Sequence, residues 1–232
     1  MQPEPWPEPL PKSLDVFRLP LDLTAPIADA DWLLLSAEEG ARAQRLHRQA
    51  DRVRFVRTRA ALRHLLGQRL QRRPQALAFT VNRFGKPALS SGEVLHFNVA
   101  HAGAFAVIAL SASVVVGVDI ERRDAAVDVA ALQPLTLSPL ELQQIDSQRV
   151  DFFDCWAAKE AVLKALGLGV AHHLRQLSVL APLTPGHGTY QLRHDAMAWP
   201  ALNALRLAAP AGYAAALAWH VPAMDPIEGL DS

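Results

Sequence analysis

Apolar residues recur at three- and four-residue steps between about residues 36 and 70, and this spacing predicts a long helical region with a break along it. Ser36 and Ser138 each stand three residues before a glutamate, a capping-box pattern that predicts a helix start at both places. Another helix is expected over about 150–166, where Gly167 follows the last periodic position.

Short apolar runs bounded by turn residues predict strands between and after these helices. The predicted strands are 16–21, 77–82, 94–100, 104–110, 114–120, 177–180, 189–194, 204–209 and 213–220. The connections in the middle group are short, so we expect 94–100, 104–110 and 114–120 to be antiparallel neighbours. The sequence RFGKP at 83–87 holds both glycine and proline, and it predicts a turn.

Each half of the chain runs from a helix into short strands, and AHAGAF at 100–105 resembles APAGYA at 209–214. This similarity favours an α+β organisation in two duplicated halves, with a joint near residues 111–117. Residues 1–13 are rich in proline and predict an extended N-terminal arm.

The 23 basic and 23 acidic side chains balance, so net charge favours no class of partner. The single cysteine, Cys155, excludes an internal disulfide framework. The N-terminus lacks the basic start and apolar run of a signal peptide, and no uninterrupted apolar stretch reaches the roughly 20 residues of a membrane helix. We therefore expect a soluble cytoplasmic protein with no membrane partner.

The charge is unevenly distributed, because eleven arginines and one acid, Asp51, lie between Arg42 and Arg73. Either a solvated helix face or an anion-binding site, for nucleic acid or a phosphorylated cofactor, explains this stretch.

Asp119 and Glu121 end an apolar strand, and they share one face because side chains alternate along a strand. Two adjacent carboxylates repel each other unless a cation neutralises them, and their hard oxygens suit Mg²⁺. The alternative is a strand end that simply reaches solvent.

In the predicted helix 150–166, Trp156, Glu160 and Lys164 follow one another at four-residue steps and so share a face. The alternative is an exposed Glu–Lys pair, which contributes only about 0.3–0.5 kcal/mol. His101, in the sequence FNVAHAG, is either a structural histidine or a phosphate ligand.

Together, F-N-x-x-H-x-G, G-x-D-I-E and W-x-x-K-E-A-x-x-K, in this order, resemble the surfactin-synthetase-activating class of 4′-phosphopantetheinyl transferases. The resemblance includes RFGKP and covers about residues 36–170. It implies an α+β fold of two similar α/β subdomains, a pseudo-dimer in which a small, mostly antiparallel sheet packs on a long helix in each subdomain. Residues 14–113 would form the coenzyme A side and residues 114–232 the metal and catalytic side, with the active site at their junction.

The resemblance also implies residue roles. Asp119, Glu121 and Glu160 match metal ligands for Mg²⁺, with Mn²⁺ as an alternative, and Glu160 also matches the general base. Lys164 matches a catalytic lysine near the pyrophosphate. The residues that match coenzyme A binding are Arg42, Arg54, Gly85, Lys86, Pro87, His101 and Lys164. Ala100 stands where the family often has a phosphate-binding serine, and Glu39 stands where it places a second basic residue.

The implied activity is transfer of the 4′-phosphopantetheine arm of coenzyme A to a serine of an apo acyl or peptidyl carrier protein, with release of 3′,5′-ADP. The carrier would dock near Arg122, Arg123 and residues 125–148, through apolar contacts from Leu132, Leu135, Leu137 and Leu140. We expect a monomer with no nucleic-acid partner.

Three other functions are compatible with parts of the sequence. Three carboxylates and a lysine also suit a metal-dependent phosphohydrolase. The arginine-rich helix suits a nucleic-acid-binding module, although zero net charge and 6% aromatic residues count against it. An inactive relative that only binds coenzyme A is disfavoured by the intact set of acidic residues.

Overall fold

The computed structural model describes residues 10–148, 150–169, 173–181, 188–194 and 199–222. Most of the predicted N-terminal arm lies outside these residues. Among them, no helix combines the length and apolar character needed to cross a membrane.

The first half of the chain contains one strand, three helices and two hairpins. These elements are β1 (Leu14–Pro20), α1 (Asp29–Leu33), α2 (Ala37–Gln44), α3 (Gln49–Leu70), β2 (Phe79–Val81), β3 (Pro87–Leu89), β4 (His96–Ala102) and β5 (Phe105–Ser111). The Ser36 capping box is confirmed, and the expected helix break falls between α2 and α3. The turn predicted at 83–87 joins β2 to β3, whose pairing was not predicted.

The second half repeats the sequence of strand, helices and strands. Its elements are β6 (Val115–Arg122), α4 (Val129–Thr136), α5 (Pro139–Asp146), α6 (Phe152–Leu166), β7 (Leu177–Leu180), β8 (Gln191–His194), β9 (Leu202–Leu207) and β10 (Tyr213–His220). The Ser138 capping box is confirmed, and α6 ends at Gly167, whose φ of 69° suits glycine.

Two three-stranded antiparallel sheets dominate the fold, in the orders β1-β5-β4 and β6-β10-β9. In each sheet the first strand of the half pairs with the last, and a hairpin adds the third strand. The resembling sequences at 100–105 and 209–214 form the two hairpin turns, with positive φ at Gly103 and Gly212. The α+β fold of two similar subdomains is therefore confirmed.

One prediction about strand pairing was wrong. β4 and β5 are antiparallel neighbours, but β6 pairs with β10 and not with β5. The short connection 112–114 carries the chain from one sheet to the next, so sequence proximity did not indicate the hydrogen-bonding partner.

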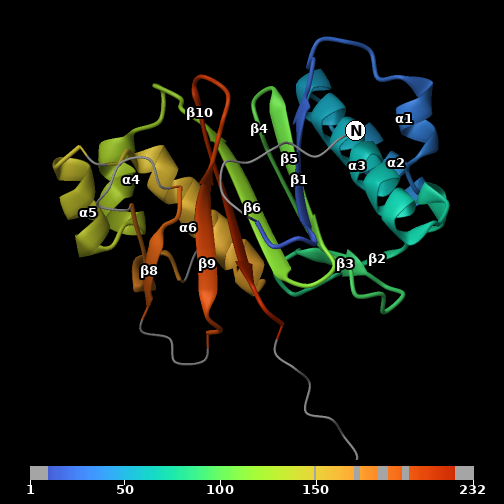
Figure 1. The fold of residues 1–232 in the computed structure, drawn as a ribbon. Helices are drawn as coiled ribbons and strands as arrows, with labels where there is room; N and C mark the ends of the chain where they lie inside the picture. The colour runs from blue at the N-terminus through green and yellow to red at the C-terminus, as the bar shows by residue number, and fades with distance from the viewer. Residues whose placement is uncertain (1–9, 149, 170–172, 182–187, 195–198, 223–232) are drawn as a thin grey trace, which may run out of the picture.

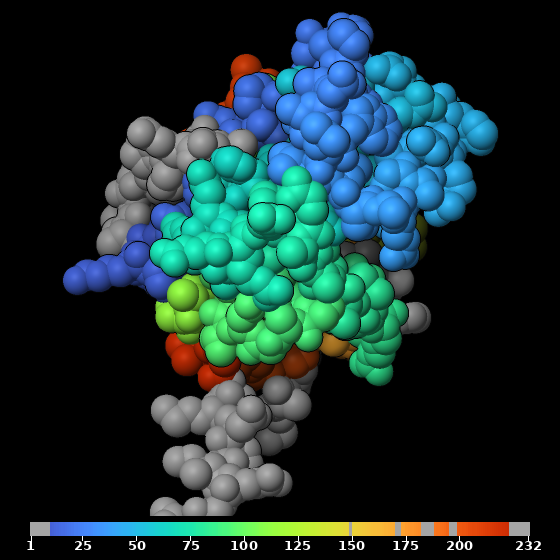
Figure 2. Space-filling view, turned by 90° about the vertical axis from the view of Figure 1, so that its right-hand side faces the viewer, coloured from blue at the N-terminus to red at the C-terminus, as the bar shows by residue number. Residues whose placement is uncertain are grey.

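The two sheets meet between β4 and β6, with helices α1–α3 on one outer side and α4–α6 on the other (Figure 1). At this junction the Val118 amide donates to Asn98 Oδ1 at 2.9 Å, and the Ala104 amide donates to the Tyr213 hydroxyl at 3.1 Å. Viewed from the side of the N-terminal helices, these helices and the following segment to about residue 95 form the outer surface (Figure 2).

Candidate active site

Strand β6 lies directly on helix α6, and Gly117 makes this contact possible. A side chain at Gly117 would collide with the backbone of Ala161 and Ala165 in α6. Because side chains alternate along a strand, Asp119 and Glu121 project from the same face as Gly117 and so toward the helix.

A cluster of three carboxylates and one lysine forms where β6 faces α6. The Lys164 ammonium donates to Asp119 Oδ1 at 2.5 Å and lies 3.3 Å from Glu160 Oε2. The Trp156 indole nitrogen donates to Glu121 Oε1 at 3.1 Å. The structure thus brings together Asp119, Glu121, Glu160 and Lys164, which the sequence placed on two separate elements.

Burial and mutual repulsion dominate the electrostatics of this carboxylate cluster. Burial raises the pKa of Asp119 to about 7, since the ion pair with Lys164 offsets it only in part and the charges of Glu160 and Glu121 add to it. Burial and the charge of Glu160 also raise the pKa of Glu121. Burial lowers the pKa of Lys164, but Asp119 and Glu160 outweigh this effect, so its net shift is upward.

The donor set of the cluster fits a hard divalent cation. Asp119 Oδ2 is buried and has no hydrogen-bond partner, and the three carboxylates repel one another. In the described part of the chain, no group of three or more His, Cys, Asp or Glu side chains is already arranged to hold a metal ion. Mg²⁺ needs no such enclosure, because it commonly takes one or two carboxylates and completes its shell with water and substrate phosphates.

A cavity of about 210 Å³ opens on the N-terminal side of the junction. It is lined by Arg42, Phe55, Thr58, Arg59, Leu62, Gly85, Pro87, Val99 and His101. A second cavity of about 460 Å³ shares Arg42, Phe55, Arg59 and Pro87 with it. The Arg42 guanidinium lies over the Phe55 ring, 5.1 Å from its centre. We call the first of these the arginine cavity.

Arg59 is a cavity residue that the sequence reasoning missed. Burial lowers its pKa although Glu39 opposes this, and its Nε lies 3.4 Å from Glu39 Oε1. Phe55, Arg59 and Leu62 recur at the spacing of one helix face, and this was the available signal. Arg63, by contrast, is buried and bonds Glu39 at 2.6 Å, so it serves the fold.

His101 lines the arginine cavity, whereas Arg54 is not among its lining residues. Arg54 Nε donates to the Gly103 carbonyl at 3.1 Å, and its Nη1 bonds Asp51 at 2.7 Å. Burial lowers the pKa of His101, and the charges of Arg54 and Lys164 lower it further. The downward shift favours the neutral imidazole of His101.

Ala100 and Lys86, two positions that the family resemblance relates to coenzyme A binding, do not line the arginine cavity. Ala100 is buried in the core at the junction, on the opposite face of β4 from Val99 and His101. The Lys86 ammonium donates to the carbonyls of Val116, Lys164 and Ala165. Gly85 and Pro87, on either side of it, line the cavity as expected.

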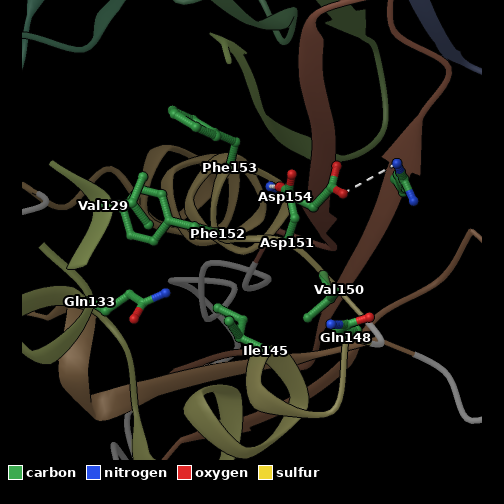
Figure 3. Close-up of a pocket in the computed structure, with 10 residues that line it drawn as sticks. Val129, Gln133, Ile145, Gln148, Val150, Asp151, Phe152, Phe153 and Asp154 are labelled. Atoms are coloured by element: carbon green, nitrogen blue, oxygen red, sulfur yellow. Dashed lines mark hydrogen bonds and ion pairs between the residues drawn. The ribbon is translucent and has the colours of Figure 1, made fainter. Parts of the chain in front are cut away.

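Another cavity, of about 490 Å³, lies elsewhere, among α4, α5, β9 and the start of α6 (Figure 3). Its walls include Val129, Ile145 and Phe152, with Asp154 at one side. Asp154 is already paired with Arg123 at 2.9 Å and Arg206 at 3.2 Å. Because none of the residues predicted for chemistry lines it, we place the site at the carboxylate cluster and the arginine cavity.

Comparisons with known proteins identify the family of the chain. Residues 115–218 match the profile of the 4′-phosphopantetheinyl transferase superfamily, and residues 28–113 match that of the 4′-phosphopantetheinyl transferase N-terminal domain. The chain is 30% identical over 179 residues to the 4′-phosphopantetheinyl transferase HetI of Nostoc sp., which covers 73% of this chain and 75% of HetI. It is 28% identical over 166 residues to a 4′-phosphopantetheinyl transferase of Bacillus subtilis, covering 68% of this chain and 71% of that protein.

The Synechocystis sp. protein slr0495, whose name assigns it provisionally to the 4′-phosphopantetheinyl transferases, is 38% identical over 167 residues. That match spans 66% of this chain and 65% of the relative, just under two thirds of its length. The two profiles cover both halves of the fold, and the HetI match extends over most of each chain. These matches, with the carboxylate cluster of the second half, place the chain in the 4′-phosphopantetheinyl transferase superfamily and confirm the prediction of an enzyme at the level of that family.

Proposed function

We propose that the chain transfers the 4′-phosphopantetheine arm of coenzyme A to a serine of an apo acyl or peptidyl carrier protein, with release of 3′,5′-ADP. The observation that carries this proposal is the position of the carboxylate cluster beside the arginine cavity. Coenzyme A presents a pyrophosphate next to a 3′-phosphoadenosine, and these two anionic groups need adjacent sites of this kind.

The proposed reaction exchanges one phosphorus–oxygen bond for another. The serine oxygen forms a bond to the β-phosphorus of coenzyme A, and the bond from that phosphorus to the bridging oxygen breaks. The electron pair of the broken bond leaves with 3′,5′-ADP, and Glu160 accepts the serine proton. Lys164 would donate hydrogen bonds to the phosphate oxygens on which charge develops.

Asp119, Glu121 and Glu160 would hold Mg²⁺, or Mn²⁺, which when bound neutralises charge on the pyrophosphate oxygens. Support comes from the unpartnered Asp119 Oδ2 and from the repulsion among the three carboxylates. On the coenzyme side, Arg42, Arg59 and His101 would hold the 3′-phosphate and adenine. Arg54 would contribute from outside the lining of the cavity, where it bonds the Gly103 carbonyl.

The carrier would dock beside the end of β6, through fewer residues than the sequence indicated. The Arg122 side chain is 56% exposed, and Leu135 and Leu140 are 67% and 37% exposed. Arg123 forms ion pairs with Asp151 and Asp154, and Leu137 is buried, so we leave these two residues out of the proposed docking surface. The two halves of the chain supply both the arginine cavity and the carboxylate cluster, so we propose that the enzyme acts as a monomer, and we propose that it acts in the cytoplasm.

The function is tested by incubating the protein with coenzyme A, Mg²⁺ and a panel of apo carrier proteins. The carrier should gain the mass of one phosphopantetheine group, and EDTA should stop the gain until Mg²⁺ or Mn²⁺ is restored. Arg122→Glu should raise KM for the carrier without changing KM for coenzyme A. Phosphate-ester hydrolysis without a carrier, or no mass gain on any carrier, would overturn the proposal.

Arg59→Gln should weaken coenzyme A binding by about tenfold or more, because a charge-assisted hydrogen bond contributes about 1.5–3 kcal/mol. The effect should be much smaller with 3′-dephospho-coenzyme A, measured by isothermal calorimetry. Arg57→Gln is the matched control, since Arg57 lies on the same helix outside the arginine cavity and pairs with Asp31 at 3.7 Å. Equal losses with both coenzymes would remove Arg59 from the 3′-phosphate.

A further inference from the structure

The loop from Asn82 to Pro87 is held rigid by its own hydrogen bonds. Asn82 Oδ1 accepts from the amides of Phe84 at 2.9 Å and Lys86 at 3.0 Å, and the Asn82 amide donates to the Lys86 carbonyl at 3.0 Å. Gly85 has a φ of 82°, a value that favours glycine. The loop therefore presents its side chains in a fixed direction.

Lys86 of this loop donates hydrogen bonds to backbone carbonyls at the C-terminal end of helix α6, across the junction between the halves. Its ammonium lies 2.6 Å from the Lys164 carbonyl, 3.3 Å from the Ala165 carbonyl and 3.0 Å from the Val116 carbonyl of β6. The last carbonyls of a helix lack helical partners and carry partial negative charge, so a cation is favoured there. A lysine ammonium has three N–H groups, and three carbonyls accept from it here.

Two other residues of the loop strengthen the same contact. Asn82 Nδ2 donates to the Gly167 carbonyl at 3.0 Å. The Phe84 ring packs so closely on Gly169 that a side chain at Gly169 would lie 2.8 Å from it. Burial lowers the pKa of Lys86 to about 8, which leaves the ammonium as the main form at neutral pH.

The loop thus touches both parts of the site at once. Gly85 and Pro87 line the arginine cavity, while Lys86 holds the backbone of Lys164, whose side chain bonds Asp119. Lys86 also holds Val116, three residues before Asp119 in β6. A shift of the loop would therefore move Lys164 and Asp119 relative to the cavity.

We propose that Lys86 is a positioning residue, which fixes Lys164 and β6 relative to the coenzyme cavity and does not bind the coenzyme through its ammonium. The inference rests on the proposed function, and it assigns Lys86 a role other than the coenzyme contact that the family resemblance implied.

The test is Lys86→Met, which removes the charge and keeps the side-chain length. We expect kcat for transfer to fall by about tenfold or more, while Kd for 3′,5′-ADP changes by less than about twofold. Hydrogen exchange of the amides of residues 165–168 should quicken by about tenfold, because the carbonyls of Lys164 and Ala165 lose the ammonium that they share. Asn82→Ala should act in the same direction with a smaller effect, and it replaces Lys86→Met if that variant does not fold.

Leu66→Ala is the control for a general loss of stability, because Leu66 is fully buried between α3 and the first sheet, in a core cluster that contains no residue of β6 or α6. It should lower the melting temperature and leave kcat and the exchange of residues 165–168 unchanged. A tenfold weaker Kd for 3′,5′-ADP with unchanged kcat in Lys86→Met would overturn the proposal and make Lys86 a coenzyme ligand. If the wild type transfers nothing, the proposed function fails, but the exchange of residues 165–168 still decides whether Lys86 holds α6.

Discussion

Asp119→Asn is expected to lower kcat for transfer by about a hundredfold to a thousandfold, the usual range for losing one group that stabilises transition-state charge. This substitution removes a carboxylate charge from the cluster but keeps the size and shape of the side chain. Lys164 retains Glu160 at 3.3 Å as an ion-pair partner, so its ammonium is not left unpaired. The measurement is the initial rate of carrier modification at saturating Mg²⁺.

The same variant should make the metal-free protein at least as stable as the wild type above neutral pH. The folded-state pKa of Asp119, about 7, is raised above the ordinary value of 3.8, so the folded state binds its proton more tightly than the unfolded state does. Stability from this group is therefore present at low pH and is lost as pH rises from about 4 through about 7. Asparagine has no such ionisation.

Thermal melts in EDTA at pH 5 and pH 8 test the stability effect. Wild type should lose more stability between the two pH values than Asp119→Asn does, and added Mg²⁺ should restore it only in the wild type. Glu93→Gln is the control, because the Glu93 side chain is 31% exposed and pairs with Arg72, outside the cluster. An unchanged transfer rate in Asp119→Asn would contradict the assignment of the site.

Lys159→Met should destabilise the fold by about 3–5 kcal/mol, the cost of leaving one charge of a buried pair without its partner. Lys159 and Glu141 are both fully buried and form an ion pair between α6 and α5. Glu141 also accepts hydrogen bonds from the amides of Ser138 and Val179, each at 2.7 Å, and so joins α5, α6 and β7. Denaturant unfolding followed by circular dichroism measures the loss.

The double variant Lys159→Met with Glu141→Gln should lose less stability than the sum of the two single variants, because no unpaired charge then remains buried. Arg72→Gln is the exposed counterpart, and the loss of its ion pair with Glu93 should cost much less stability than the loss of the buried pair. Strict additivity in the double variant would show that the ion pair is not energetically coupled.

Features decided by local spacing were predictable from the sequence. Side-chain alternation placed Asp119 and Glu121 on one face, and helical spacing placed Glu160 beside Lys164. The two capping boxes were also found, because each depends on residues only three positions apart. The pairing of β6 with β10 was missed, since those partners are about a hundred residues apart in the chain.

Roles that depend on a distant partner could not be predicted. Lys159 stands in the same motif as Glu160, yet only the approach of α5 shows that it is buried against Glu141. Lys86 lies in the turn predicted at 83–87, and that local pattern gives no information about the three distant carbonyls to which its ammonium donates. The four-residue spacing from Phe55 could have distinguished Arg59 from the other arginines of the helix. The cavity that Arg59 lines could not be predicted, because it forms only when the helix packs against the rest of the fold.

The closed pairing within each half bears on how the chain folds. Leu14 pairs opposite Ser111, and Val115 pairs opposite His220, so each sheet joins the beginning of its half to the end. Pairing two strands that are distant in sequence requires a long loop to close, and the chain loses conformational entropy before the strands make their contacts. Chains with many such pairings therefore fold slowly, in roughly milliseconds to seconds. Among the described residues, neither half contributes a strand to the sheet of the other. The described strand partners of the first sheet are therefore all present once residue 111 has left the ribosome, whereas the face of this sheet that packs on β6 and β10 is covered only after the second half has been synthesised.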